Sequence, residues 1–276
     1  MAETIDAFLA QAGAALKKGD GRRARGLLDA ALVRAPDHAG AHHLKGLLDL
    51  QENDAASAVA HLLIAERGSR GPVAAVNLAV ALVRAGRSDE AERLLIRTTK
   101  THPDHAPASY NLGHLLLREG RPGEAEPRLR QAVAADPHYL AAWSDLGTLL
   151  LDLDRLDEAG SCFRRVLEID PGHMSAVYNL ALVDHRAGRF EQAVERFGVC
   201  RETVGLTREI AMGLGAGLQE LGRYDAACEV YRELLARDPE AYVFVLRNLA
   251  ATAKGFFDAR PSRLRAMLGL DQSLER

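Results

Sequence analysis

The chain has 276 residues, of which 47% are hydrophobic, 26% charged and only 5% aromatic, as in ordinary globular proteins. Its formal net charge of −3 gives no reason to expect nucleic-acid binding. The start, "MAETIDAFLA", has acidic residues where a secretory signal has basic ones, and no apolar run reaches membrane-spanning length, so we expect a cytoplasmic protein.

The sequence repeats itself with a period of 34 residues. Proline-containing segments close most of the repeats: "RAPDH" ends at residue 38, "THPDH" at 105, "ADPHY" at 139, "IDPGH" at 173 and "RDPEA" at 241. Counting back from the prolines predicts seven units, at residues 5–38, 39–71, 72–105, 106–139, 140–173, 174–207 and 208–241. The second unit is one residue short, and in the second and sixth units Arg70 and Gly205 stand in place of the proline.

Each unit has the pattern of two helices joined by a turn. In the fifth unit, Trp143, Leu146, Gly147 and Leu150 fall on one stripe of a first helix. A glycine suited to ending that helix recurs in the turns, at Gly19, Gly86, Gly120, Gly188 and Gly222. The second helix carries a recurring alanine, at Ala24, Ala58, Ala91, Ala125, Ala159, Ala193 and Ala227. A small side chain at this place allows two helices to approach closely.

The motif Trp143-x2-Leu146-Gly147, followed by Ala159, Phe163 and Pro171, resembles the signature of the tetratricopeptide repeat family. The resemblance covers residues 5–241 and implies an all-α fold, a right-handed α-solenoid of antiparallel helix pairs. It also implies a non-catalytic scaffold for protein–protein interaction. Two residues depart from the pattern: Lys45 lies at a place that is usually apolar, and Pro127 lies inside a second helix, which we expect it to bend.

The last 35 residues, 242–276, fit no complete repeat. The segment "YVFVLRNLAATAK" predicts one more helix, ended by Gly255, that covers the apolar side of the last repeat. The segment "RPSRLRAMLGL" predicts a short helix opened by Pro261. Since stacked repeats need a terminal cap, we expect residues 242–276 to supply it. The segment also weakly resembles the one that follows repeat arrays in bacterial glycosyl- or sulfotransferases.

No motif predicts an enzyme, a cofactor site or a metal site. The glycine-rich stretch "GLGAGLQELG" at 213–222 follows no predicted strand and lacks the third glycine of a dinucleotide fingerprint. His38 and His42 have helical spacing but no third ligand for zinc, and five of the ten histidines lie in predicted turns. The three cysteines, at 162, 200 and 228, are expected to be small buried side chains.

The face of the first helices opposite the core stripe carries a second polar pattern. In tetratricopeptide superhelices, which the chain resembles, this face lines the concave groove. We number the places in each unit from its first residue. In the third to sixth units the sixth places on this face are Asn77, Asn111, Asp145 and Asn179, and the thirteenth places are Arg84, Arg118, Asp152 and Arg186. Tyr110 and Tyr178 flank the same face, and His114 is a further candidate groove residue.

We interpret these side chains as a peptide-binding ladder in which amides bind the backbone of an extended, acidic partner segment and arginines bind its carboxylates. The amide column is similar in this respect to that of the O-GlcNAc transferase repeat domain. The competing interpretation is that asparagine here is a family feature, and that arginine simply suits a helix C-terminus. The dicarboxylate clamp that binds chaperone tails is excluded, because no fifth place is Lys and no ninth place is Asn.

Two further functions remain open from the sequence. One is a substrate-presenting accessory module for a separate glycosyl- or sulfotransferase. The other is a self-assembling scaffold whose groove takes the terminus of another copy.

Overall fold

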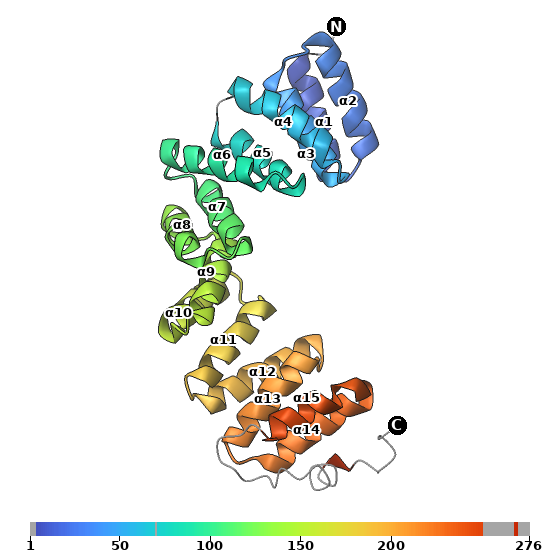
Figure 1. The fold of residues 1–276 in the computed structure, drawn as a ribbon. Helices are drawn as coiled ribbons and strands as arrows, with labels where there is room; N and C mark the ends of the chain where they lie inside the picture. Colours follow the sequence, from blue (N-terminus) through green and yellow to red (C-terminus); the bar gives the residue numbers. More distant parts are fainter. Residues whose placement is uncertain (1–3, 70, 251–267, 270–276) are drawn as a thin grey trace. The chain divides into compact units, whose positions relative to one another are not determined.

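The computed structural model describes residues 4–69, 71–250 and 268–269, and every regular element within them is a helix. In the first part of the chain these are α1 (Ile5–Lys17), α2 (Gly21–Arg34), α3 (Ala39–Gln51), α4 (Ala55–Ser69), α5 (Pro72–Arg84), α6 (Ser88–Thr101), α7 (Ala106–Arg118) and α8 (Pro122–Ala135). They are followed by α9 (Leu140–Asp152), α10 (Leu156–Ile169), α11 (Met174–Arg186), α12 (Phe190–Val204), α13 (Arg208–Glu220), α14 (Tyr224–Arg237), the short 3₁₀ helix η1 (Pro239–Ala241) and α15 (Tyr242–Ala250). The predicted all-α fold of consecutive helix pairs is confirmed (Figure 1).

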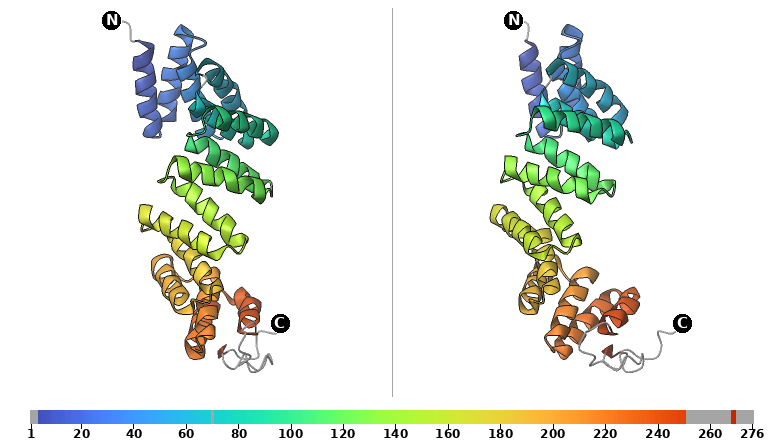
Figure 2. Two further views of the ribbon diagram at one scale, coloured as in Figure 1. Left: turned by 90° about the vertical axis from the view of Figure 1, so that its left-hand side faces the viewer. Right: turned by 60° about the vertical axis from the view of Figure 1, so that its left-hand side comes forward.

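The chain forms two compact units, residues 1–142 and 143–276, and the division lies within α9. In the first unit α1 packs on α2, α3 on α4, α5 on α6 and α7 on α8. In the second unit α11 packs on α12 and α13 on α14, while α15 covers part of α13 (Figure 2). Each helix therefore buries its apolar stripe mainly against its neighbours in the sequence, as expected for a repeat protein.

One large side chain from the second helix of each pair is fully buried against the first helix. This column consists of Leu28, Leu62, Leu95, Leu129, Phe163, Phe197 and Tyr231. The eighth place of each first helix is correspondingly small: Ala12, Gly46, Ala79, Gly113, Gly147, Ala181 and Gly215. A Cβ atom added at Gly147 would lie 2.8 Å from the Phe163 ring, and one at Gly215 would lie 2.2 Å from the Tyr231 hydroxyl. Gly147 and Gly215 thus leave the space that the Phe163 and Tyr231 rings occupy, whereas Phe197 is accommodated opposite Ala181.

Tyr231 combines this packing with a buried hydrogen bond. The Gln219 amide donates to the Tyr231 hydroxyl at 2.8 Å, and both side chains are fully buried. Burial also raises the pKa of Tyr231 well above its ordinary value. The tyrosine is therefore a neutral core residue of the last helix pair.

Trp143 is less buried than the repeat pattern predicts. Leu146, Gly147 and Leu150, on the same stripe, are buried, but Trp143 retains intermediate exposure. Other first helices carry smaller groups at this place, such as Ala75. Because an indole is large, it is often covered incompletely where smaller side chains are enclosed.

The starts and ends of the helices explain three histidines and five glycines that recur in the turns. The side chains of His38, His105 and His173 each accept a hydrogen bond at 3.2 Å from a backbone N–H in the first turn of the following helix. These histidines are helix caps, which accounts for their place in the turns. The five predicted turn glycines have φ between +72° and +75°, and Asn53 and Asp154 take the same conformation in the other two pairs.

Two aspartates occupy core places that the sequence pattern assigns to apolar residues. Asp49 and Asp184 are only 2% and 4% exposed. Arg25 pairs with Asp49 at 3.1 Å, while Arg189 pairs with Asp184 at 2.8 Å and Arg196 with its other oxygen. A buried carboxylate is tolerated only with such partners, so these acids are structural.

The two departures from the repeat pattern are accommodated locally. The half-buried Lys45 side chain pairs with Asp29. Helix α8 continues through Pro127, whose side chain is exposed. The three cysteines are buried free thiols, as predicted.

The predicted covering helix at the C-terminus is present as α15. Val245 and Leu249 are buried, whereas Val243 and Phe244 are 55% and 46% exposed, so only one face of the helix covers the repeat. The predicted end at Gly255 and the predicted start of the tail helix at Pro261 lie outside the described residues.

Candidate functional site

The residues predicted to form the ladder are divided between the two units. The first unit contains Asn77 and Arg84 on α5, and Tyr110, Asn111, His114 and Arg118 on α7. The second unit contains Asp145 and Asp152 on α9, and Tyr178, Asn179 and Arg186 on α11. The contacts of each set are therefore described within its own unit.

A cavity of about 190 Å³ between α5 and α7 brings together four of the predicted residues. Arg84, Asn111, His114 and Arg118 supply its polar groups. The remaining lining comes from apolar side chains: Ala79, Val80, Val83, Leu95 and Leu115. The cavity therefore has an apolar wall and two guanidinium groups.

The arginines at the thirteenth places differ in what they bind. Arg84 Nη1 donates to the carbonyl oxygen of Leu50 at 2.9 Å, and Arg186 Nη1 donates to that of Leu151 at 2.8 Å. Each thereby adds a second hydrogen bond to a carbonyl near the end of the preceding first helix, which also accepts the backbone N–H of Asn53 or Asp154 in the following turn. Among the described residues, Arg118 forms no hydrogen bond or ion pair, so its guanidinium remains open to a ligand.

This difference predicts unequal effects on stability. Arg84→Ala removes a hydrogen bond to the backbone and should lower the free energy of unfolding by about 1 kcal/mol. Arg118→Ala removes an exposed side chain without a partner and should change it by less than about 0.5 kcal/mol. Urea unfolding followed by circular dichroism measures both values. Equal losses would show that Arg118, too, serves the fold.

The amides of the ladder are also unequal. The Asn77 amide donates to His43 Nε2 at 2.7 Å, and burial lowers the pKa of His43, which keeps that nitrogen available as an acceptor. The Asn111 amide donates to the carbonyl of Pro107 at 2.7 Å, within its own helix. Asn179 makes no hydrogen bond within the described part of the chain. Asn77 and Asn111 each retain an acceptor oxygen for a partner.

The two tyrosines have different surroundings. The Tyr110 ring meets that of Tyr139 edge-on at 5.1 Å and lies 5.7 Å from that of the exposed His114. The Tyr178 ring packs on buried Phe197 at 5.6 Å, and burial raises the pKa of its phenol. Tyr178 thus extends the core of the second unit.

The acids in the second unit lie at different depths. Asp145 is half-buried, and Asp152 is exposed at the last residue of α9.

Sequence analysis did not identify the apolar wall of the cavity. Val83 and Leu115 line it beside the predicted polar residues. The available signal was helix α5, "PVAAVNLAVALVR", which is apolar around most of its circumference. Such a helix buries more than one face or leaves apolar surface for a ligand.

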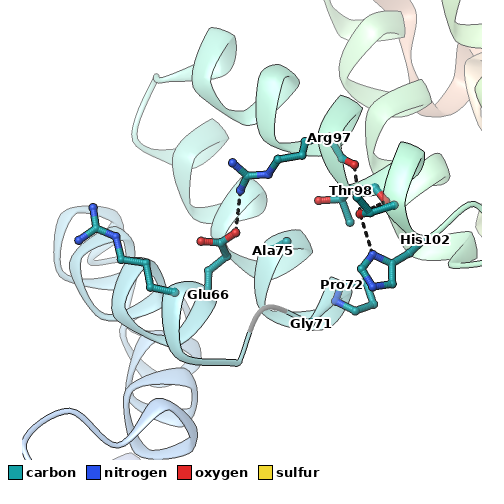
Figure 3. Close-up of a pocket in the computed structure, with 9 residues that line it drawn as sticks. Glu66, Gly71, Pro72, Ala75, Arg97, Thr98 and His102 are labelled. Atoms are coloured by element: carbon teal, nitrogen blue, oxygen red, sulfur yellow. Dashed lines mark hydrogen bonds and ion pairs between the residues drawn. The ribbon is translucent and has the colours of Figure 1, made fainter.

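A second cavity in the first unit, of about 550 Å³, contains none of the predicted residues (Figure 3). It lies at the end of α4, the start of α5 and the end of α6. The Arg97 side chain reaches Glu66 across it at 2.6 Å, and Thr101 bonds to His102 at 2.8 Å. Arg97 is thus already paired, whereas within the described residues the exposed Arg67, which also lines this cavity, is not. Because the cavity contains none of the ladder residues, the cavity between α5 and α7 is the candidate for the predicted site.

No helix among the described residues has both the length and the apolarity to cross a membrane. Among solved structures, the chain is similar to the pilF protein of Pseudomonas aeruginosa, with a TM-score of 0.68 and 16% identity over 75% of this chain and 94% of that one. It is similar to PilW, a widely conserved type IV pilus biogenesis factor, with a TM-score of 0.66 and 17% identity over 76% of this chain and 98% of that one.

A third similar structure is YrrB, described as a tetratricopeptide repeat protein with an unusual peptide-binding site. Its TM-score is 0.52, with 24% identity over 63% of this chain and 91% of that one. At these identities the likeness concerns the fold. No curated protein matches the sequence.

The sequence itself matches tetratricopeptide repeat family models. One model matches residues 9–72, 76–137, 110–173 and 145–199, and a second matches residues 211–241. These ranges cover most of the chain. Each of the first four spans two consecutive helix pairs, and the last spans α13 and α14. The chain therefore belongs to the tetratricopeptide repeat family.

Proposed function

We propose that the chain is a non-catalytic interaction module that binds an extended, acidic segment of a partner protein, using the cavity between α5 and α7 as its main contact. The observation that carries the proposal is the unpaired guanidinium of Arg118 beside an apolar wall. The family fold and the peptide-binding site named for the similar YrrB support this class of function.

The cavity suits an apolar side chain next to a carboxylate. An apolar cavity of about 150 Å³ accommodates benzene, so the 190 Å³ between α5 and α7 accepts a ring or a branched aliphatic side chain. Arg118 then binds the neighbouring carboxylate through charge-assisted hydrogen bonds. Arg84 adds a second positive charge, since its bond to Leu50 occupies only one of its five donors.

The asparagines supply contacts to the partner's backbone. Asn77 and Asn111 each direct one amide hydrogen into the fold, so we assign their oxygens to N–H groups of an extended segment. In the second unit, Asn179 provides an amide with no bond within the described residues. Asp145 and Asp152 reverse the charge preference on α9, and we assign a basic or amide-bearing residue of the partner to them.

Seven repeats over residues 5–241 and a C-terminal segment over residues 242–276 are part of the same proposal. The first helices begin at residues 5, 39, 72, 106, 140, 174 and 208, so that each proposed repeat starts with a helix. Asn77 and Asn111 then come from two successive repeats in the first unit, and Asp145 and Asn179 from two successive repeats in the second.

Fluorescence anisotropy with two synthetic peptides tests the proposal. The first peptide has a phenylalanine between glutamates, and the second replaces the glutamates by lysines. Arg118→Ala should weaken binding of the glutamate peptide about tenfold, equivalent to 1.4 kcal/mol. The matched control is Arg93→Ala, which removes an exposed arginine on α6 outside the cavity and should leave the affinity unchanged.

The proposal fails if the glutamate peptide does not bind, or if it binds the Arg118→Ala variant as tightly as the parent chain. A stronger dependence on Arg93 than on Arg118 would place the contact elsewhere. Binding of another copy instead would appear in light scattering as a mass that rises with concentration.

A further inference from the structure

The second unit contains a larger cavity that none of the predicted residues line. It has a volume of about 750 Å³ and lies between α12, α13 and α14. Its apolar lining includes Val194 on α12, Leu214 and Leu218 on α13, and Val230 on α14. Leu214, Leu218 and Val230 are also core residues, so the cavity gives a ligand access to the apolar interior of this unit.

Gly198 keeps the cavity open. It lies inside α12, where glycine costs about 1 kcal/mol relative to alanine, and a Cβ atom added to it would meet nothing within 4 Å. No close approach of a neighbouring helix therefore explains the glycine. At the same place the other second helices carry Asp29, Leu63, Ile96, Arg130, Arg164 and Arg232, all much larger side chains. The missing side chain leaves space between α12 and α14, the second helices of two successive pairs.

The rim of the cavity is acidic. Glu202, Glu229 and Glu233 contribute three carboxylates and Arg201 one guanidinium, which gives a net charge of −2. Arg201 pairs with Glu233 across the rim, and Arg237 pairs with the same carboxylate at 2.9 Å, so Glu233 is neutralised. Within the described residues Glu202 and Glu229 have no hydrogen-bond or ion-pair partner. Two carboxylates, one on α12 and one on α14, are thus available to a ligand.

We propose that this cavity is a second docking site, and that its occupant is a partner segment in which apolar residues are flanked by lysine or arginine. The apolar side chain enters the space over Gly198 and contacts Val194, Leu214 and Leu218. The flanking cations pair with Glu202 and Glu229, where charge complementarity excludes acidic segments. This preference is opposite to that of the cavity between α5 and α7, and the inference does not depend on the function proposed for that cavity.

Gly198→Leu is the decisive variant. It restores a side chain of the kind that Leu63 supplies in the second helix pair, and occupies the space over Gly198. Because the added Cβ meets no neighbour and leucine favours helix, the variant should fold at least as well as the parent chain. Loss of binding in this variant therefore reports on the cavity.

The probe is a fluorescein-labelled peptide with two leucines between lysines, titrated into the full chain at low ionic strength. Gly198→Leu should weaken binding of this peptide at least about tenfold. The double variant Glu202→Gln/Glu229→Gln should weaken it about fivefold, and this second effect should become smaller as salt is added, because salt screens the lost charge pairs. The twin peptide with glutamates should not bind this cavity. In ¹⁵N-resolved spectra, the lysine peptide should shift the Gly198 amide signal.

Unchanged affinity of the lysine peptide for the Gly198→Leu variant, or an unshifted Gly198 signal at saturation, would overturn the inference. Arg118→Ala should leave the affinity for the leucine–lysine peptide unchanged, which distinguishes this cavity from the one between α5 and α7. If the parent chain binds the leucine–lysine peptide but not the phenylalanine–glutamate peptide, only the proposal for the cavity between α5 and α7 fails.

Discussion

Replacing Phe163 with alanine should lower the free energy of unfolding by about 3–5 kcal/mol, as large-to-small changes at buried aromatic residues do. Phe163 is only 1% exposed, and its ring fills the space opposite Gly147. Gly147 has no side chain that could move into the void. Urea unfolding followed by circular dichroism measures the loss.

Phe244→Ala is the matched control. This phenylalanine is 46% exposed on α15, and the Arg208 guanidinium lies 5.1 Å from its ring centre. Its replacement should cost less than about 1 kcal/mol, since an exposed cation–π contact contributes little. A loss at Phe244 as large as that at Phe163 would contradict the assignment of the core column.

Gly215→Ala should destabilise the chain by about 1–3 kcal/mol, the range for overpacking. In a helix interior this substitution would otherwise be stabilising by about 1 kcal/mol. Here the new methyl group would lie 2.2 Å from the Tyr231 hydroxyl, and that ring is fully buried and held by Gln219. The tyrosine can yield only by breaking its hydrogen bond.

A double-mutant cycle with Tyr231→Leu isolates this contact. In the first and third helix pairs, alanine already faces leucine, as Ala12 faces Leu28 and Ala79 faces Leu95. In the Tyr231→Leu background, Gly215→Ala should therefore be neutral or stabilising. The same penalty in both backgrounds would mean that the helix backbone, and not the tyrosine ring, requires glycine at residue 215.

The helices and their pairing were predictable because they depend on local periodicity. The recurring alanine near the start of each second helix and the turn glycines mark the same points in the sequence and in the structure. The sequence pattern overestimated the burial of Trp143. Periodicity shows which face of the helix a side chain lies on, but its exposed fraction depends on the size of the side chains packed around it. The buried acids Asp49 and Asp184 likewise depend on arginines of neighbouring elements.

The candidate site was predictable only in part. The period placed Arg84, Asn111, His114 and Arg118 on one face, and the cavity between α5 and α7 brings these four together. The period could not show that Arg84 donates to Leu50, because that bond depends on how closely two first helices approach. Nor could it show that Gly198 faces open space, whereas Gly147 and Gly215 face rings.

The most direct test of the central claim is a methyl-resolved NMR titration of the full chain with the phenylalanine–glutamate peptide. The account predicts saturable shifts of the Val80, Val83 and Leu115 methyl signals, which line the cavity between α5 and α7. It also predicts that half-maximal shifts require about tenfold more peptide in Arg118→Ala and the same amount of peptide in Arg93→Ala as in the parent chain. Methyl signals that do not move at saturation, or that titrate with equal affinity in both variants, would contradict the account.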